Sequence, residues 1–127
     1  MRITWLILGL CMLQLALCGS ASLPIDAKVV ELDQSVEDYA PGAYYKVAVP
    51  APGTLAVVVE QVPVEMLTKI VIINEAESWL ADQQTTSPGE KITVEARADA
   101  AGWYYIGVMD LNGKSHDTPY AFRVTMK

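Results

Sequence analysis

Short runs in which apolar and polar residues alternate, separated by proline and glycine, dominate the chain after residue 22. Tyr45, Val47 and Val49 form one such run, which ends at Pro50-Ala51-Pro52-Gly53. Successive side chains of a β-strand point to opposite faces of its sheet, so this alternation is typical of strands with one buried face. It predicts strands at residues 44–49, 54–60, 70–73, 91–97, 103–109 and 120–126.

The spacing of these runs also restricts the fold class. After residue 22, no segment of ten or more residues shows sustained helical spacing of apolar residues. Residues 64–68 and 75–81 have room for a helical turn, and we interpret them as loops or strand ends. Strands at intervals of roughly ten residues, with turns between them, predict an antiparallel, jelly-roll-like β-sandwich.

Two connections between the expected strands have distinct compositions. Residues 82–89 are polar, and we expect them to form a mobile loop. Asn112-Gly113 lies between the last two strands, and both residues tolerate the positive φ of a tight turn. Because residues 114–119 must also be accommodated, we expect an irregular hairpin loop there.

The alternation assigns every second residue of a strand to the core. On the strand at 103–109, burial of Ile106 leaves Trp103, Tyr105 and Gly107 on the outer face, and the same count places Tyr44 outward. The side chains expected in the core are Tyr45, Val47, Leu55, Val57, Ile92, Val94, Tyr104, Ile106, Tyr120 and Phe122.

The outward aromatic residues are the candidate ligand-binding residues. Tyr44, Trp103 and Tyr105, with Gly107 between aromatic side chains, predict an open surface on which a flat ligand can stack. The alternative is structural, since an outward tryptophan in a small sandwich is usually covered, here by the loop expected to carry Trp79.

The first residues have the layout of a secretory signal. Arg2 precedes an apolar run at residues 3–18, and small residues follow at 19–22. Cleavage after Ala21 would remove residues 1–21 as a signal peptide and leave one domain at 22–127. The residues that end at Cys18 also resemble a bacterial lipobox, in which Cys18 is acylated, although Leu17 departs from that pattern. An uncleaved anchor is the third outcome, but the run is shorter than the ~20 residues that span a bilayer.

Each outcome places the domain outside the cytoplasm, secreted, periplasmic or attached to the cell envelope. The membrane is then a partner only through the N-terminal signal or a lipid anchor. Both cysteines, Cys11 and Cys18, lie in the apolar segment, so residues 22–127 offer no disulfide and no thiolate ligand for zinc. His116 is the single histidine, and its neighbours in Ser115-His116-Asp117 point apart on an extended chain. We therefore expect a polar loop there, no enzyme and no cofactor.

The distribution of charge and the spacing of the acidic residues argue against nucleic-acid binding and against a metal site. The formal charge is −6, from nine basic and fifteen acidic side chains spread along the chain. Nucleic acids require clustered Lys and Arg, so no nucleic-acid partner is expected. Neither acidic group has the spacing of a calcium loop, so we interpret both as solvated turns and expect no metal site. These groups are Glu31, Asp33, Glu37 and Asp38 near the N-terminal end, and Asp110, Asn112 and Asp117 in the last loop.

The order of motifs resembles the bacterial and archaeal pre-peptidase C-terminal domain. That family has an aromatic pair before the first core strand, a Gly-Thr-Leu turn into the second and a Gly-x-Tyr-Tyr-Ile-x-Val strand near the end. The matching residues here are Tyr44-Tyr45, Gly53-Thr54-Leu55 and Gly102 to Val108, with Gly89 to Ile92 and Tyr120 to Val124 also in order. The resemblance covers about residues 29–126.

The resemblance implies a compact jelly-roll-like sandwich and a noncatalytic role. In the family the module is usually appended to secreted proteases and other hydrolases, where it assists secretion or localisation, and some collagenase-linked relatives bind collagen. We expect the module to stand by itself here, without a peptidase domain. Family members often have an Asp-rich segment before the third core strand. Residues 65–69 stand in its place here, so a calcium role is not implied.

The sequence therefore predicts a noncatalytic, extracytoplasmic module that binds a surface polysaccharide or protein. The alternative is a structural or assembly accessory of the envelope, such as a lipoprotein, whose sandwich packs edge to edge with a larger partner. Open Trp103 and Tyr105 side chains favour the first function, whereas a long uncovered strand edge favours the second. A small secreted hydrolase is the least favoured, because no nucleophile motif is present.

Overall fold

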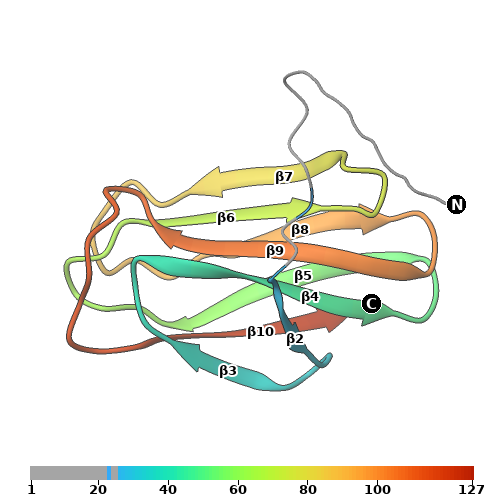
Figure 1. The fold of residues 1–127 in the computed structure, drawn as a ribbon. Helices are drawn as coiled ribbons and strands as arrows, with labels where there is room; N and C mark the ends of the chain where they lie inside the picture. The colour runs from blue at the N-terminus through green and yellow to red at the C-terminus, as the bar shows by residue number, and fades with distance from the viewer. Residues whose placement is uncertain (1–22, 24–25) are drawn as a thin grey trace, which may run out of the picture.

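The computed structural model describes residue 23 and residues 26–127, so the signal segment and Cys18 lie outside the described residues. The described chain forms a sandwich of two sheets and contains no helix, so no helix within it is long and apolar enough to cross a membrane (Figure 1). Its strands are β2 Lys28–Val30, β3 Ser35–Asp38, β4 Gly42–Val49, β5 Gly53–Gln61, β6 Thr68–Ile73, β7 Trp79–Gln84, β8 Thr93–Ala98, β9 Gly102–Asp110 and β10 Tyr120–Met126.

The strand order is that of a jelly roll. One sheet has the order β3-β10-β5-β8 and the other β2-β4-β9-β6-β7. From β3 to β10 the pairs are nested, because β3 pairs with β10, β4 with β9, β5 with β8 and β6 with β7, all antiparallel. This confirms the predicted jelly-roll-like sandwich. The added edge strand β2 is the exception to the antiparallel prediction, since it runs parallel to β4.

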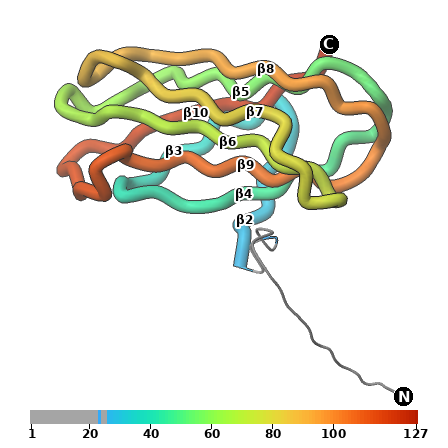
Figure 2. Tube along the Cα trace, turned by 90° about the horizontal axis from the view of Figure 1, so that it is seen from above, coloured from blue at the N-terminus to red at the C-terminus, as the bar shows by residue number. Residues whose placement is uncertain are grey.

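The core lies between the two sheets, which Figure 2 shows as two layers. Nine of the ten side chains predicted to be buried are buried, among them Tyr45, Val57 and Tyr120. The prediction was wrong for Ile92, which is half-buried and lies one residue before β8. Because Ile92 precedes the strand, its side chain packs against the margin of the core instead of occupying a position in the pleat.

Two predicted connections were wrong. Residues 82–84 belong to β7, so the polar loop begins after them, whereas residues 79–81 form the start of this strand, which agrees with the interpretation of residues 75–81 as loop or strand end. Asn112-Gly113 does not join a hairpin, because β9 and β10 lie in different sheets and the segment between them crosses from one layer to the other. The two strands at the N-terminal end, β2 and β3, were not predicted, because they are short and mostly exposed or half-buried.

Candidate functional site

The predicted site residues meet on the outer face of the five-stranded sheet. Opposite residues on neighbouring strands share a face of the sheet. Tyr44 lies opposite Gly107, Lys46 opposite Tyr105 and Ala48 opposite Trp103. All three predicted aromatic residues therefore share this face, as the alternation along β4 and β9 predicted.

Strand β7 adds a fourth aromatic residue to the same face. Ile73 of β6 pairs with Tyr105 on one side and, across a shift in the register between β6 and β7, with Trp79 on the other. Neighbouring strands are about 4.8 Å apart, so the backbones at Trp79 and Tyr105 are separated by about 10 Å. Tyr44, Trp79, Trp103 and Tyr105 are called the aromatic face below. Sequence reasoning interpreted residues 75–81 as a loop or strand end and did not assign Trp79 to this face.

The aromatic face is neither the fully open surface nor the covered structural cluster that the sequence left as alternatives. Tyr44, Trp103 and Tyr105 are half-buried, whereas Trp79 is 47% exposed. Trp79 lies in a strand, so the prediction of a loop that carries it over Trp103 was wrong. Each aromatic side chain keeps part of its surface in contact with solvent, and a ligand can reach that part.

The prediction of an open surface at Gly107 was also wrong. Gly107 is buried, and a Cβ atom added there would lie 2.7 Å from Val71 Cγ2, 2.9 Å from Tyr44 Cε1 and 3.0 Å from Met109 Cε. Neighbouring side chains therefore occupy the space that Gly107 leaves. Aromatic and aliphatic groups therefore meet over Gly107, and no gap is left there between two rings.

Two contacts hold Trp103 in place. Its backbone N–H donates to Glu75 Oε1 at 3.0 Å, and Lys46 Nζ lies 4.9 Å from the centroid of the indole ring, within the range of a cation–π contact. Gly102, at φ 146°, precedes it, and a Cβ atom there would collide with the Glu75 carboxylate. Glycine at this position therefore permits the contact between Glu75 and the start of β9.

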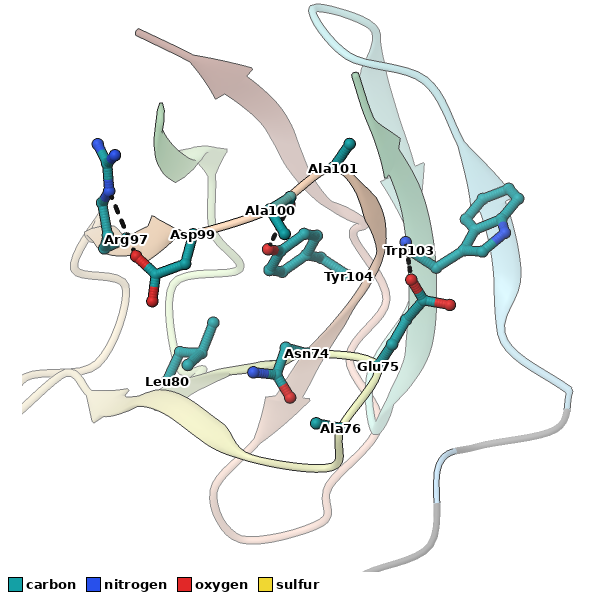
Figure 3. Close-up of a pocket in the computed structure, with 10 residues that line it drawn as sticks. All are labelled: Asn74, Glu75, Ala76, Leu80, Arg97, Asp99, Ala100, Ala101, Trp103 and Tyr104. Carbon is teal, nitrogen blue, oxygen red and sulfur yellow. Dashed lines mark hydrogen bonds and ion pairs between the residues drawn. The ribbon is translucent and has the colours of Figure 1, made fainter. Parts of the chain in front are cut away.

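Hollows lie on two sides of Trp103. One has a volume of about 230 Å³. Figure 3 shows the Tyr104 ring directed into it and the Trp103 indole directed away from it. The other, called the Trp103 groove below, has a volume of about 510 Å³. It is lined by Val29, Val30, Glu31, Leu32, Ala48, Val49, Pro50 and Trp103. The aromatic face thus continues at Trp103 into a largely apolar groove beside β2.

Two buried tyrosines and Asp38 form a polar group near β2. Tyr45 Oη donates to Asp38 Oδ2 at 2.8 Å and lies 2.6 Å from Tyr120 Oη. Burial raises the pKa of the Tyr120 hydroxyl to about 12, and burial together with its two partners raises the pKa of Tyr45 further. Burial also opposes ionisation of Asp38, but hydrogen bonds from Lys28, Tyr45 and the Tyr39 amide outweigh it, so the Asp38 pKa is lowered.

His116 has a partner that sequence reasoning missed. Its Nε2 lies 2.5 Å from Oδ2 of Asp110, whose side chain is 1% exposed, and the Asn112 amide donates to Asp110 Oδ1. Burial opposes ionisation of Asp110, but these hydrogen bonds lower its pKa overall. The pair joins the end of β9 to the crossover segment. A spacing of six residues through an irregular loop carries no periodic signal that would reveal it.

The acidic residues do not converge. Among residue 23 and residues 26–127, no group of three or more His, Cys, Asp or Glu side chains is placed to hold a metal ion. Asp38 binds Lys28, and Asp110 binds His116. The interpretation as solvated turns was wrong for Glu37 and Asp38, which lie in β3, and for Asp110, which is buried at the end of β9. The other members, Glu31, Asp33, Asn112 and Asp117, are exposed and lie outside the strands.

Comparison with solved structures agrees with this architecture. The chain is similar to the pre-peptidase C-terminal domain of collagenase from Bacillus anthracis, with 17% identity and a TM-score of 0.64, over 83% of this chain and 100% of that one. A periplasmic inhibitor of g-type lysozyme from Aeromonas hydrophila, PliG, has 13% identity and a TM-score of 0.48, over 80% and 97% of the two chains. No family model matches the sequence, and no curated protein does.

The likeness to the collagenase domain gives the class of fold. The chain has the fold of a pre-peptidase C-terminal domain, as its motifs predicted. At 17% identity the likeness concerns the fold, and the function has to be argued from the aromatic face and the Trp103 groove.

Proposed function

We propose that this protein is a noncatalytic, extracytoplasmic β-sandwich module that binds a surface polysaccharide or protein through its aromatic face. The observation that carries the proposal is that β4, β7 and β9 bring four partly exposed aromatic side chains to one face of one sheet. Aromatic rings offer a large contact area with few rotatable bonds, so they lose little conformational entropy when a ligand stacks on them.

The contrast between the two outer faces supports this assignment. The outer face of the four-stranded sheet carries ion pairs, Arg123 with Glu60 and Lys127 with Glu95, which suit contact with water. The outer face of the five-stranded sheet also has an ion pair, Lys69 with Asp82, but it differs in carrying the four aromatic side chains beside the buried aliphatic side chains of Val71 and Ile73. Contiguous apolar surface on one side of a small domain is typical of an interaction site.

The polar loop at residues 115–117 has a structural explanation, which is consistent with a noncatalytic role. Ser115-His116-Asp117 has the residue types of a hydrolase, but the histidine is bound to the buried Asp110 and thereby fixes the crossover between the sheets.

The extracytoplasmic location rests on the N-terminal signal layout, with cleavage before Ser22 or acylation at Cys18 as its two principal outcomes. Intact-mass measurement of the exported protein distinguishes them.

Pull-down with two alanine variants tests the proposal. Wild type, Trp103→Ala and Tyr105→Ala are incubated with cellulose, chitin and fibrillar collagen, and retained protein is measured. We expect wild type to be retained on at least one matrix and both variants to bind it about tenfold more weakly, because truncating a central aromatic contact costs upwards of ~1.4 kcal/mol.

The matched control is Tyr39→Ala. Tyr39 is 55% exposed but lies between β3 and β4, away from the aromatic face, so its loss should leave retention unchanged. Melting temperatures of all variants should remain within a few degrees of wild type. No retention of wild type on any matrix, with large losses of stability in Trp103→Ala and Tyr105→Ala, would contradict the proposal and favour the accessory protein.

The accessory function has one observation in its favour. β7 is an edge strand of six residues, most of them exposed, and an unpaired edge can extend the sheet of a partner. Trp79 begins this strand and also belongs to the aromatic face. Trp79→Ala would therefore weaken either interaction, whereas Trp103→Ala separates them.

A further inference from the structure

The Trp103 groove has one wall built by a short edge strand. Half of its lining residues, Val29 to Leu32, come from β2 and the two residues after it, and the others come from β4, Pro50 and Trp103. Figure 2 shows β2 at the margin of its layer, beside β4. The shape of the groove therefore depends on where β2 lies.

Packing alone holds β2 weakly. The strand has three residues and pairs with one neighbour, β4. Val30 is buried, but Lys28 is exposed and Val29 is 63% exposed. Beyond the strand, Leu32 packs against the margin of the core and the Asp33 amide donates to Val124 O at 2.8 Å, so the segment after β2 is anchored. β2 itself has one buried valine and a three-residue parallel pairing, which offer little free energy against the conformational entropy that its ordering costs.

An ion pair joins β2 to the rest of the sandwich. Lys28 Nζ lies 2.6 Å from Asp38 Oδ2, and this carboxylate also accepts the Tyr45 hydroxyl at 2.8 Å, while its Oδ1 accepts the Tyr39 amide at 2.9 Å. Through Tyr45 and Tyr120 the network includes strands of both sheets. Asp38 is thus fixed from several sides, which makes it a rigid partner for Lys28.

We infer that Lys28 and Asp38 are positioning residues for the Trp103 groove, because their ion pair holds β2 as its wall. The inference rests on the proposed function, in which a ligand contacts Trp103. Lys28 contributes no lining atom to the groove, so it acts through the position of Val29 and the residues that follow. The other charged side chain in the hollow between β2 and β3 is Glu37, of the opposite sign to Lys28.

The test compares Lys28→Met, Lys28→Arg and Asp38→Asn in the full chain. Methionine keeps most of the apolar stem and removes the charge, arginine keeps the charge, and asparagine keeps an acceptor for Tyr45. Lys127→Met is the control, since it breaks an ion pair of similar length, with Glu95, on the outer face of the other sheet. Amide hydrogen exchange of residues 28–32 and the indole N–H resonance of Trp103 are measured by NMR.

We expect Lys28→Met and Asp38→Asn to raise exchange at residues 28–32 by about fivefold and to shift the Trp103 resonance, because a charge-assisted hydrogen bond is lost. Lys28→Arg should leave both the exchange rates and the Trp103 resonance close to wild type, and Lys127→Met should change neither. Unchanged exchange at residues 28–32 in Lys28→Met would overturn the inference. An equal rise in exchange over all strands would also overturn it, because it would show general destabilisation.

Binding measurements distinguish a failure of this inference from a failure of the proposed function. If wild type is retained on cellulose, chitin or collagen, Lys28→Met should bind that matrix more weakly, and equal binding would overturn the role of β2 in the site. If wild type is retained on none of the three and Trp103→Ala and Tyr105→Ala lose much of their stability, the proposed function fails. The exchange and indole measurements then still decide whether the ion pair positions β2.

Discussion

Gly107 determines how the aromatic face is packed. At this position on β9, the missing side chain lets Tyr44, Val71 and Met109 approach one another over the sheet. A glycine inside a strand usually weakens it, and close approach of a neighbouring group is a common reason for its presence. Here the approaching groups are Tyr44 of the aromatic face and its neighbours Val71 and Met109. Gly107 therefore permits the packing of this outer face, although glycine weakens the strand itself.

We expect Gly107→Ala to destabilise the protein by about 1–3 kcal/mol, because the added methyl group overlaps tightly packed neighbours. The nearest atoms are Val71 Cγ2 at 2.7 Å and Tyr44 Cε1 at 2.9 Å, so the Tyr44 ring has to move. Urea unfolding measures the loss. Adding Tyr44→Ala should recover part of it, and a double-mutant cycle with no coupling between the two positions would contradict the steric explanation.

The connection from β9 to β10 shows how one hydrogen-bonded pair of side chains, Asp110 and His116, fixes a segment. This segment crosses from one sheet to the other, and its start is held by the buried Asp110 carboxylate, which accepts from the Asn112 amide and contacts His116. A crossover without regular strand pairing needs such local hydrogen bonds to satisfy its backbone groups. The pair thus has a structural role in the described chain.

Acid should reveal this role. The pKa of Asp110 is lowered in the folded protein, so its contribution to stability is present above the unfolded-state pKa, about 3.9, and is lost as pH falls through the lower folded value. Asp110→Asn should reduce stability at pH 7 and lessen the further loss between about pH 4 and pH 2. Urea unfolding at several pH values measures both effects.

Glu77→Gln is the matched control, because it removes one carboxylate at an exposed position in the turn between β6 and β7. This variant should unfold like wild type across the pH range. Equal stability of Asp110→Asn and wild type at pH 7 would show that the Asp110 carboxylate and its hydrogen bonds contribute nothing. Asp38, whose pKa is also lowered, adds to the acid loss in all these proteins in the same direction.

At the scale of the whole molecule, one core between two sheets supports every surface described above. Val57 of β5 is fully buried and belongs to the same hydrophobic cluster as Tyr45, Ile106 and Phe122. The outer-face residues of β4 and β9 alternate with these core residues along the same strands. Loss of the core would therefore remove the aromatic face as well.

Val57→Asp should prevent folding. An unpaired buried charge costs several kcal/mol, which is comparable with a total stability of about 5–15 kcal/mol for a domain. Far-ultraviolet circular dichroism should show β structure in wild type and its loss in the variant. Thr54→Asp, at a half-buried position on the opposite face of the same strand, is the control and should remain folded. A folded Val57→Asp protein would contradict the single shared core.

Several features of this protein follow from local sequence. The alternation along each strand predicted the inward positions of Tyr104 and Ile106 and the outward positions of Trp103 and Tyr105, because the pleat imposes a period of two wherever the strand pairs. Strand spacing and turn residues, together with the order of motifs, predicted the jelly-roll class. These signals are contained in consecutive residues, so they could be read before any contact was known.

The partners of these residues were decided only by the tertiary structure. The filling of the space over Gly107, the place of Trp79 on the aromatic face and the pairing of His116 with Asp110 all depend on side chains that other segments bring close. The same holds for β2, a strand of three residues whose position depends on Asp38, ten residues away. Local periodicity determines which way a side chain points, whereas contacts across strands determine what it meets there.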